Sequence, residues 1–272
     1  MNKTYHFMAG LPRSGSTVLS AILNQNPDVY SGPQTDLVEM LYLLESQIPS
    51  YESYRAELLL DGFESVLNNM ADSLYASIDR PVIIDKNRGW GTPYNFGQLS
   101  GYLNKSGKVI LTMRPILEVL ASFVKIAKNS QKITGSLPYL NQNLWVSNYR
   151  NETDALVENL MMPNGEIDRA IYSIANLLQN HRDRVYLIWF DDLVNNPLET
   201  LNRIYDFLGL DRFAHNFESI KPLDKHNDLA GYGIPGLHDV GKKLEMPKTN
   251  PSDYLSDYAI TKFGNALDFL TE

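Results

Sequence analysis

Residues 7–17 read Phe7-Met8-Ala9-Gly10-Leu11-Pro12-Arg13-Ser14-Gly15-Ser16-Thr17. The apolar run that begins near Tyr5 predicts a short buried strand, residues 10–14 predict a turn, and apolar residues at helical spacing predict a helix over 15–26. A helix that starts directly after such a turn points its unpaired N–H groups and the positive end of its dipole at the turn. The stretch therefore predicts an anion-binding loop between a strand and a helix.

The spacing of this loop nearly matches the nucleotide-binding P-loop, G-x4-G-K-[ST]. Gly10 and Gly15 occupy the two glycine positions, but Ser16 replaces the lysine and the nearest cation is Arg13. A planar guanidinium grips an anion through two parallel hydrogen bonds, whereas lysine offers a point charge. We expect the loop to bind an anion in a manner different from that of the standard ATPases. An ordinary strand-turn-helix with an incidental arginine is the alternative.

A second strand-to-helix turn follows. The apolar run 109–113 ends at Arg114-Pro115, and the helical pattern after it contains Ser122, eight residues beyond Arg114. Proline suits the first position of a helix. Together the two loops resemble those of the sulfotransferases, which carry a P-R-S-G-[ST]-T or P-K-S-G-T-T loop. The chain resembles bacterial-type members, and its first loop is most similar to those of tyrosylprotein and carbohydrate sulfotransferases.

This resemblance implies a donor and the residues that bind it. Sulfotransferases use 3′-phosphoadenosine 5′-phosphosulfate (PAPS) and release 3′-phosphoadenosine 5′-phosphate (PAP). The resemblance assigns the 5′-phosphosulfate to Arg13, Ser14, Gly15, Ser16 and Thr17. It assigns the 3′-phosphate to Arg114 and Ser122. A charged fork and a hydroxyl that converge on one phosphate are chemically suited to that role.

The fold follows from how strand-like and helical patterns alternate. Strand-like runs occur at about 5–9, 82–85, 108–113 and 184–189, with long helical patterns between them. This alternation predicts one α/β domain over residues 1–272, a P-loop-like three-layer sandwich with a central parallel sheet flanked by helices. We expect helical insertions at about 35–78 and 142–180 and a C-terminal loop or lid at about 222–250.

The strand at 82–85 runs into Asp85-Lys86-Asn87-Arg88. Ligands of open parallel sheets lie at the carboxyl ends of the strands, so Asp85, Lys86 and Arg88 are expected to face the same crevice as Arg13. Related sulfotransferases carry a D-K-x-R or K-x-P segment here, which implies that Lys86 lies near the transferred sulfuryl group. We therefore predict Arg13 and Lys86 as catalytic cations. The alternative is a surface pair, either between Lys86 and Asp85 or between Arg88 and a carboxylate.

The general base is harder to assign. Residues 13–35 resemble the tyrosylprotein sulfotransferases without gaps, but the glutamate pair that supplies their base is replaced here by Pro33 and Gln34. Neither side chain accepts a proton at neutral pH, which counts against tyrosine sulfation. The candidates left open are Asp36, Glu39, His226 and His238. We take His238 as catalytic, because histidine titrates near neutral pH and its loop resembles the G-L-H-x-V segment of bacterial relatives.

The composition of the chain limits the classes of binding partner and the cellular compartment that we expect. A net charge of −8 argues against nucleic-acid and acidic-membrane partners, which require a basic face. The absence of cysteine excludes disulfides and thiolate catalysis. No leader precedes the first strand and no apolar run of about 20 residues occurs, so we expect a cytoplasmic protein. No cluster has metal-ligand spacing, so we expect no metal.

These observations predict a sulfotransferase that moves a sulfuryl group from PAPS to a hydroxyl or amine by in-line transfer without a metal. The acceptor is a small molecule, a sugar or a peptide, and the sequence leaves its identity and the oligomeric state open. One alternative is a P-loop kinase with Asp85 as magnesium ligand, which lacks the lysine at Ser16 and gives Arg114 and Ser122 no role. The other is a non-catalytic nucleotide-binding member of the family, which is favoured by Gln34 at the position where the resembled enzymes have a glutamate.

Overall fold

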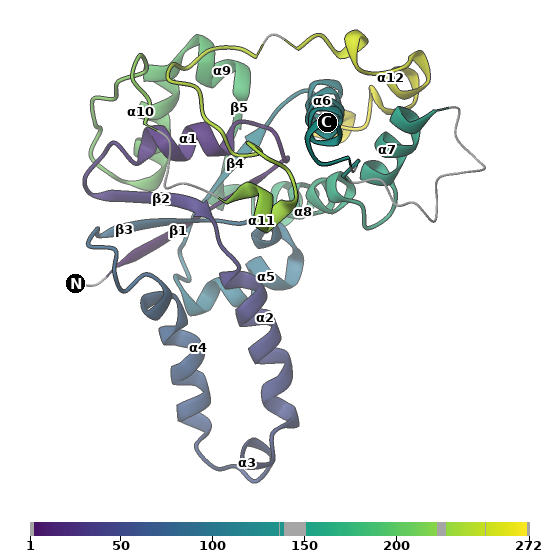
Figure 1. Ribbon diagram of the computed structural model, residues 1–272. Helices are drawn as coiled ribbons and strands as arrows, with labels where there is room; N and C mark the ends of the chain where they lie inside the picture. Colours follow the sequence, from purple (N-terminus) through teal and green to yellow (C-terminus); the bar gives the residue numbers. More distant parts are fainter. Residues whose placement is uncertain (1–2, 136, 139–150, 222–226, 248, 271–272) are drawn as a thin grey trace.

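A central parallel sheet organises the computed structural model, which describes residues 3–135, 137–138, 151–221, 227–247 and 249–270. Within these residues five strands pair in the order β2-β3-β1-β4-β5 (Figure 1). The strands are β1 (Thr4–Gly10), β2 (Val29–Gln34), β3 (Val82–Lys86), β4 (Val109–Met113) and β5 (Val185–Trp189). Because later strands are added on both sides of β1, the carboxyl end of β1 is the position at which such sheets bind ligands.

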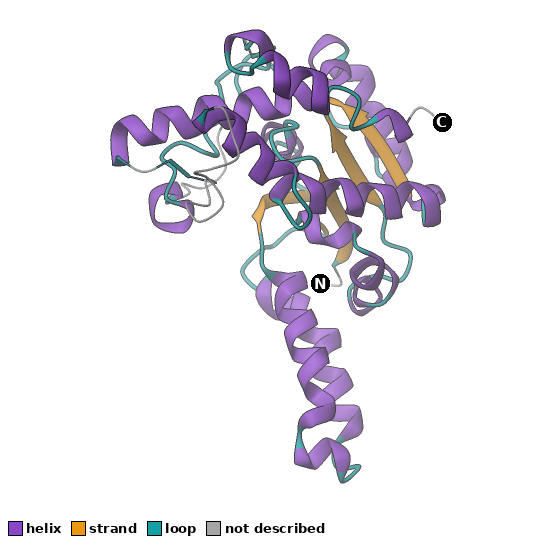
Figure 2. Ribbon diagram, turned by 90° about the vertical axis from the view of Figure 1, so that its right-hand side faces the viewer, coloured by secondary structure: helices purple, strands orange, loops and turns teal. Residues whose placement is uncertain are grey.

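Helices cover both faces of the sheet, which gives the three layers seen in Figure 2. One face packs against α1 (Ser16–Leu23), α9 (Phe190–Asn195) and α10 (Pro197–Leu208). The other packs against α5 (Pro93–Gly97), α6 (Ile116–Thr134), α7 (Glu152–Met161), α8 (Glu166–Asn180) and α12 (Asp257–Phe263). The remaining α-helices are α2 (Leu37–Gln47), α3 (Glu52–Arg55), α4 (Leu60–Leu74) and α11 (Asp228–Tyr232). Short 3-10 helices are η1 (Ile48–Ser50), η2 (Arg88–Gly91), η3 (Leu99–Tyr102), η4 (Arg182–Arg184), η5 (Pro251–Asp253) and η6 (Asp268–Leu270).

The sheet divides its side chains between two apolar cores, because neighbouring residues of a strand face opposite sides. In β1, Phe7 and Ala9 join the core beneath α6 and α8, whereas Met8 joins the core beneath α1 and α10. All three side chains are buried, and burying a large apolar side chain contributes about 1.5–3 kcal/mol. The expected three-layer α/β sandwich is confirmed.

One strand, β2, was not predicted from the sequence. Its segment Ser31-Gly32-Pro33-Gln34 contains two residues that interrupt a strand pattern, and its pairing with β3 shifts register between Ser31 and Gln34. Since β2 is an edge strand, one of its sides needs no hydrogen-bond donor, and proline is tolerated there. The strand pattern was therefore hidden by residues that only an edge position accepts.

The expected helix after Arg114 begins one residue later than predicted. Pro115 has a φ of −50° and a ψ of 131°, so it is the N-cap of α6, and the first helical residue is Ile116. The prediction of Pro115 as the first helical residue is therefore wrong by one position. The polar stretch that the structure describes at 227–247 contains α11 and is otherwise irregular, while residues 222–226 of the expected loop lie outside the described chain.

Two helical insertions leave the sheet. Between β2 and β3, α2 and α4 run side by side and project from the body, with α3 at their far end (Figure 1). We call residues 37–74 the arm. Helices α7 and α8 fill the second insertion from residue 151 onward, and residues 142–150 lie outside the described chain. None of the described helices is both long and apolar enough to span a membrane.

Candidate active site

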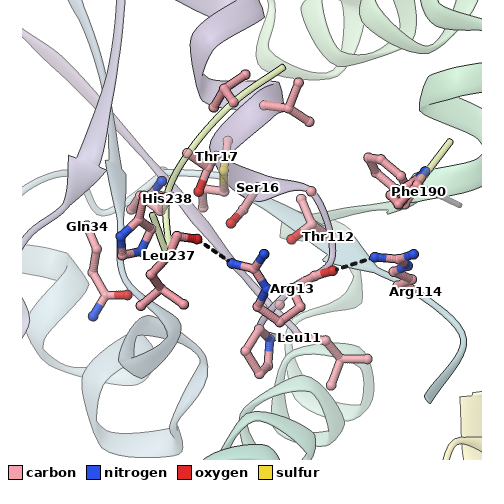
Figure 3. Close-up of a pocket in the computed structure, with 18 of the residues that line it drawn as sticks. Leu11, Arg13, Ser16, Thr17, Gln34, Thr112, Arg114, Phe190, Leu237 and His238 are labelled. Atoms are coloured by element: carbon pink, nitrogen blue, oxygen red, sulfur yellow. Dashed lines mark hydrogen bonds between the residues drawn. The ribbon is translucent and has the colours of Figure 1, made fainter. Parts of the chain in front are cut away.

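A cavity of about 590 Å³ lies at the carboxyl ends of β1, β3 and β4. Its size is in the range of sites for nucleotide-sized ligands, about 300–1,000 Å³. Most of the lining residues come from the loop after β1, the ends of β3 and β4, and the segment 237–247, of which Leu237 and His238 lie near Arg13 in Figure 3. Four chain segments that are distant in sequence thus converge where the sequence predicted a ligand.

The loop after β1 is shaped by two glycines. Gly15 has a φ of +85°, and a Cβ at this position would lie 2.2 Å from the Phe190 ring. Gly10 has a φ of +133°, and a Cβ there would lie 2.1 Å from the carbonyl oxygen of Thr112. Only glycine satisfies both the backbone conformation and the close approach. The two glycines therefore fix the turn that aims the first residues of α1 at the cavity.

Ser14 stabilises this loop from inside. Its hydroxyl donates to the carbonyl oxygen of Leu11 at 2.5 Å and shares a hydrogen bond with Thr112 Oγ1 at 2.7 Å. The side chain is buried and does not line the cavity, whereas Ser16 and Thr17 do. The contact that Ser14 can offer a ligand in this arrangement is its backbone N–H.

Arg13 joins three parts of the site. It adopts a φ of 62°, which is rare for a residue other than glycine. Its Nε donates to Ser122 Oγ on α6 at 3.2 Å, and its Nη1 donates to the carbonyl oxygen of Leu237 at 2.6 Å. Ser122 does not itself line the cavity, so the structure places it behind Arg13. The first loop, α6 and the 227–247 segment are thereby connected through one guanidinium.

Arg114 lies beside this loop and is almost fully buried. Its Nη1 donates to the carbonyl oxygen of Arg13 at 3.3 Å, its Nε donates to Glu118 Oε2 at 2.9 Å, and its guanidinium lies 5.3 Å from the centre of the Phe190 ring. Its Nη2 is buried and has no hydrogen-bond partner among the described residues. A buried charged donor without a partner is costly, which makes this nitrogen a candidate contact for an anion.

Lys86 reaches the cavity from the end of β3. The residue is 6% exposed, and its Nζ has no hydrogen-bond partner among the described residues. Burial, followed by the nearby charge of Arg88, lowers the pKa of Lys86 to about 8. An ammonium group buried without a counter-ion is unfavourable, so an anion in the cavity would relieve its desolvation.

Asp85 does not face the cavity, and the prediction that it does is wrong. Its carboxylate is fully buried on the opposite face and accepts hydrogen bonds from Thr35 Oγ1 at 2.7 Å, Tyr75 Oη at 2.5 Å and Trp90 Nε1 at 2.6 Å. Burial raises the pKa of Asp85. The physical reason is the alternation of strand residues, which turns Asp85 away when Lys86 points inward. Asp85 instead anchors the segments on either side of β3.

Arg88 lines the cavity and is also paired. Its Nη2 forms an ion pair with Glu166 Oε1 of α8, and a second Glu166 oxygen pairs with Arg169 at 3.0 Å. The expectation that Arg88 faces the crevice is confirmed, and so is the alternative that it pairs with a carboxylate. Lys86, by contrast, has no such partner among the described residues.

His238 is the base candidate that reaches the cavity. Its Nδ1 lies 2.7 Å from Asp228 Oδ1, and its backbone N–H donates to Asp228 Oδ2 at 2.9 Å. Asp228 is buried and was not singled out in the sequence. An acidic residue at the start of a short helix is also favoured by the helix dipole alone. The sequence therefore contains no signal that Asp228 pairs with a histidine. The two residues form an Asp–His pair of which His238 lines the cavity and Asp228 does not.

The other base candidates lie elsewhere. Asp36 is the exposed N-cap residue of α2, and neither Asp36 nor Glu39 lines the cavity. The Glu39 carboxylate accepts a hydrogen bond from Asn87 Nδ2 at 2.9 Å, and partial desolvation raises the pKa of Glu39. His226 lies outside the described residues. Gln34 does line the cavity (Figure 3).

In the described part of the chain, no group of three or more histidine, aspartate or glutamate residues could hold a metal ion. The charged groups that line the cavity include the cations Arg13, Lys86, Arg88 and Arg114. The cavity therefore offers fixed positive charge to an anionic ligand.

Comparison with known proteins gives one family. A sequence model of the sulfotransferase domain matches residues 3–227. A search of curated protein sequences finds no match. Among solved structures, the chain is similar to the sulfotransferase domain from the curacin biosynthetic pathway, with 17% identity, 97% of this chain and 98% of that chain covered, and a TM-score of 0.52.

Two bacterial structures are similar to the same degree. A sulfotransferase from Alicyclobacillus acidocaldarius has 13% identity, coverage of 84% of this chain and 88% of that chain, and a TM-score of 0.52. A sulfotransferase from Mycobacterium avium has 14% identity, coverage of 99% and 77%, and a TM-score of 0.52. At such low identity these likenesses support the fold, while the family rests on the sequence model.

Proposed function

Because the chain belongs to the sulfotransferase family, we propose that it transfers a sulfuryl group from PAPS to a hydroxyl or amine of an acceptor and releases PAP. The observation that carries this proposal is a pair of buried donors, Lys86 Nζ and Arg114 Nη2, which come from two residues that line one cavity and have no hydrogen-bond partner within the described chain. A donor molecule with two separate anionic groups fits a cavity with two separate donors of this kind.

The residues present suit the two ends of PAPS. The N-terminus of α1, with Ser16 and Thr17, and the guanidinium of Arg13 would hold the 5′-phosphosulfate, together with the backbone of Ser14 and Gly15. Arg114 lines the cavity and would hold the 3′-phosphate. Ser122 lies behind Arg13 and outside the lining, so it would reach the phosphate only with a shift of the Arg13 side chain. Ser122 Oγ accepts a hydrogen bond from Arg13, so its own O–H proton can be donated to an anion.

Within this site the cations act on charge that develops during transfer. Bound PAPS supplies the sulfuryl group and a stable phosphate leaving group. Arg13 and Lys86 are held before reaction begins, so their positive charge stabilises the transition state without reorganisation. A sulfuryl group carries less negative charge than a phosphoryl group, and fixed side-chain cations can therefore take the place that metal ions have in phosphoryl transfer.

His238 is the proposed base. Its contact with Asp228 places the ring proton on Nδ1, which leaves Nε2 as the basic nitrogen that takes a proton from the acceptor hydroxyl or amine. The acceptor is a small molecule, a sugar or a peptide. Because Gln34 cannot act as a base, the proposal differs at this point from the tyrosylprotein enzymes that the loop resembles.

The kinase alternative finds little support. A kinase would need a carboxylate for magnesium at this edge of the sheet, and Asp85, the candidate, is enclosed by three hydrogen-bond donors on the other face. A non-catalytic member of the family would bind the same nucleotide but would not turn it over. An assay of turnover therefore distinguishes it from an enzyme.

Two measurements test the proposal. Calorimetry with PAP and with magnesium ATP should show binding of PAP, and radiolabelled PAPS incubated with pooled sugars, phenols, alcohols and amines should give a labelled product in at least one pool. Preferential binding of magnesium ATP would support the kinase. Binding of PAP without labelled product in any pool would support the non-catalytic member. Arg13→Ala is the control that should lose both binding and product.

A further inference from the structure

The arm is the part of the molecule that the proposed transfer reaction does not use. It leaves the body directly after β2, and Figure 2 shows that its far end has no neighbouring element. Its two long helices pack against each other through apolar side chains that face inward, among them Leu41 on α2 and Leu67 on α4. The arm is therefore a packed helical element, continuous with one core of the body, rather than an extension of a loop.

The outer surface of the arm is unusually apolar. Nine of the nineteen exposed large apolar side chains of the described chain lie on it, although it spans only residues 37–74. These nine are Met40, Tyr42, Leu43, Tyr51, Leu58, Leu59, Leu60, Val66 and Leu74. Exposed apolar residues scattered singly need no explanation, but a concentration on one projecting element is typical of an interaction surface.

The same arm is strongly acidic. It carries seven acidic side chains and one basic side chain, Arg55, so it accounts for six of the eight net negative charges of the chain. The acidic residues are Glu39, Glu45, Glu52, Glu57, Asp61, Glu64 and Asp72. A large excess of negative charge on an apolar surface favours a positively charged partner and repels a copy of the same surface.

The exposed apolar side chains and the acidic side chains of the arm are both concentrated at its far end. We call Tyr51, Leu58, Leu59 and Leu60, with Glu52, Glu57, Asp61 and Glu64, the tip; all eight are exposed. Arg55 is also exposed in this span, so four carboxylates stand against one guanidinium. Leu59 is 79% exposed, the highest fraction among the large apolar side chains described. Glu57 and Leu59 have φ angles of 57° and 56°, which side chains other than glycine rarely adopt. Such backbone conformations are concentrated at functional positions.

We propose that the tip of the arm is a docking surface for a basic, amphipathic segment of another protein. The leucines supply the apolar contact, and the four carboxylates of the tip select a partner that carries lysine or arginine beside its apolar side chains. A second copy of this chain is disfavoured, because two tips of the same charge repel each other. An anionic lipid surface is disfavoured for the same reason.

The test uses a defined peptide. An 18-residue amphipathic helix of leucine and lysine, labelled with a fluorophore, is titrated with the full-length protein and followed by anisotropy at low and at high salt. The control peptide has glutamate in place of every lysine. The proposal predicts saturable binding of the lysine peptide that weakens at least about tenfold at high salt, because exposed charges are screened, and no binding of the glutamate peptide.

Matched variants locate the site. Glu57→Lys combined with Glu64→Lys should weaken binding about tenfold or more, and Leu58→Ser combined with Leu59→Ser should do the same at either salt concentration. The controls are Asp211→Lys and Leu198→Ser, which change an exposed acid and an exposed leucine (56% exposed) outside the arm, and these should stay within about twofold. All these side chains are exposed, so thermal unfolding should match the parent.

Three results would overturn the proposal. The first is no saturable binding of the lysine peptide, and the second is an equal loss in the arm variants and in the controls. The third is that the leucine substitutions abolish self-association in sedimentation velocity, or binding to zwitterionic lipid vesicles, while peptide binding is unchanged. In that case the tip is a dimer or membrane contact.

Discussion

The loop after β1 and the end of β3 each deliver a cation to the cavity, but the protein holds the two cations in opposite ways. The guanidinium of Arg13 donates to Ser122 and to the carbonyl oxygen of Leu237, whereas Lys86 Nζ is buried without a partner among the described residues. A cation that the fold already satisfies is part of the structure, and its removal disturbs several segments at once. A cation that the fold leaves unsatisfied depends on a ligand, and its removal should affect chemistry more than folding.

The largest effect is expected from Lys86→Met, which keeps the length of the side chain and removes the charge. If Lys86 stabilises charge in the transition state, turnover with PAPS should fall about a hundred- to a thousandfold, while the affinity for PAP changes much less. Steady-state kinetics together with calorimetry separate the two effects. The comparison of the two cations would be broken by a folded Lys86→Met enzyme with turnover near that of the parent.

Arg88→Met is the matched control for this prediction. Arg88 also follows β3 and lines the cavity, but it is paired with Glu166, so its charge is partly committed within the protein. We expect a smaller loss of turnover than in Lys86→Met. Equal losses would mean that the general positive charge of the cavity matters rather than the unpartnered ammonium.

The buried charge of Lys86 should also affect the free energy of unfolding of the protein. Burial lowers the pKa of Lys86 to about 8, so between pH 8 and about 10.5 the unfolded state binds more protons than the folded state. The free energy of unfolding should therefore rise with pH across this window, by on the order of 3 kcal/mol relative to Lys86→Met. Urea unfolding of both proteins at several pH values measures the difference. A parallel pH dependence of the two proteins would show that Lys86 is charged at no cost in the fold.

A smaller effect is expected from substitution of Arg114, which has hydrogen-bonded nitrogens like those of Arg13 and one buried nitrogen that resembles the Lys86 ammonium. Nη1 donates to Arg13 and Nε donates to Glu118, whereas Nη2 has no partner in the part of the chain that the structure describes. Arg114→Ala should weaken PAP binding roughly ten- to a hundredfold, as expected for a lost charge-assisted contact, and should leave AMP binding little changed. Calorimetry with both ligands checks this. Equal losses for PAP and AMP would mean that Arg114 acts by holding the backbone of Arg13.

Glu118→Gln is the control for the arginine. It removes the carboxylate that pairs with Arg114 Nε but leaves the cation in place. PAP should then still bind more tightly than AMP. A loss of this discrimination in Glu118→Gln would mean that the orientation of the guanidinium, rather than its presence, reads the 3′-phosphate.

What could be predicted from the sequence follows the same division. The loop residues near Arg13 are consecutive in sequence, and the spacing of their glycines predicted the first turn. Apolar runs predicted the strands β1, β3, β4 and β5. Partners that come from distant segments left no local signal. The contacts of Arg13 with Leu237 and of His238 with Asp228 arise only when the 227–247 segment folds across the cavity.

Orientation was the other limit. The sequence predicted that Asp85 and Lys86 share a crevice because both lie at the carboxyl end of a parallel strand, but strand geometry sends them to opposite faces. The helices of the arm were predicted from their pattern, yet which of their apolar residues lie outside could not be, because both sides of α2 and α4 are apolar. Periodicity gives the existence of an element more readily than its neighbours.

The smallest effect concerns metal, where the prediction is no change. If Arg13 and Lys86 together neutralise the charge that develops during transfer, then turnover in excess EDTA should equal turnover in magnesium within error, because fixed cations replace the metal of phosphoryl transfer. A magnesium titration of EDTA-treated Lys86→Met sharpens the comparison, since a metal that substitutes for the missing ammonium would restore part of the lost rate. An absolute magnesium requirement in the parent enzyme would contradict the prediction. It would mean that neither the satisfied cation nor the unsatisfied one supplies the necessary charge, and it would revive the kinase alternative despite the enclosed carboxylate of Asp85.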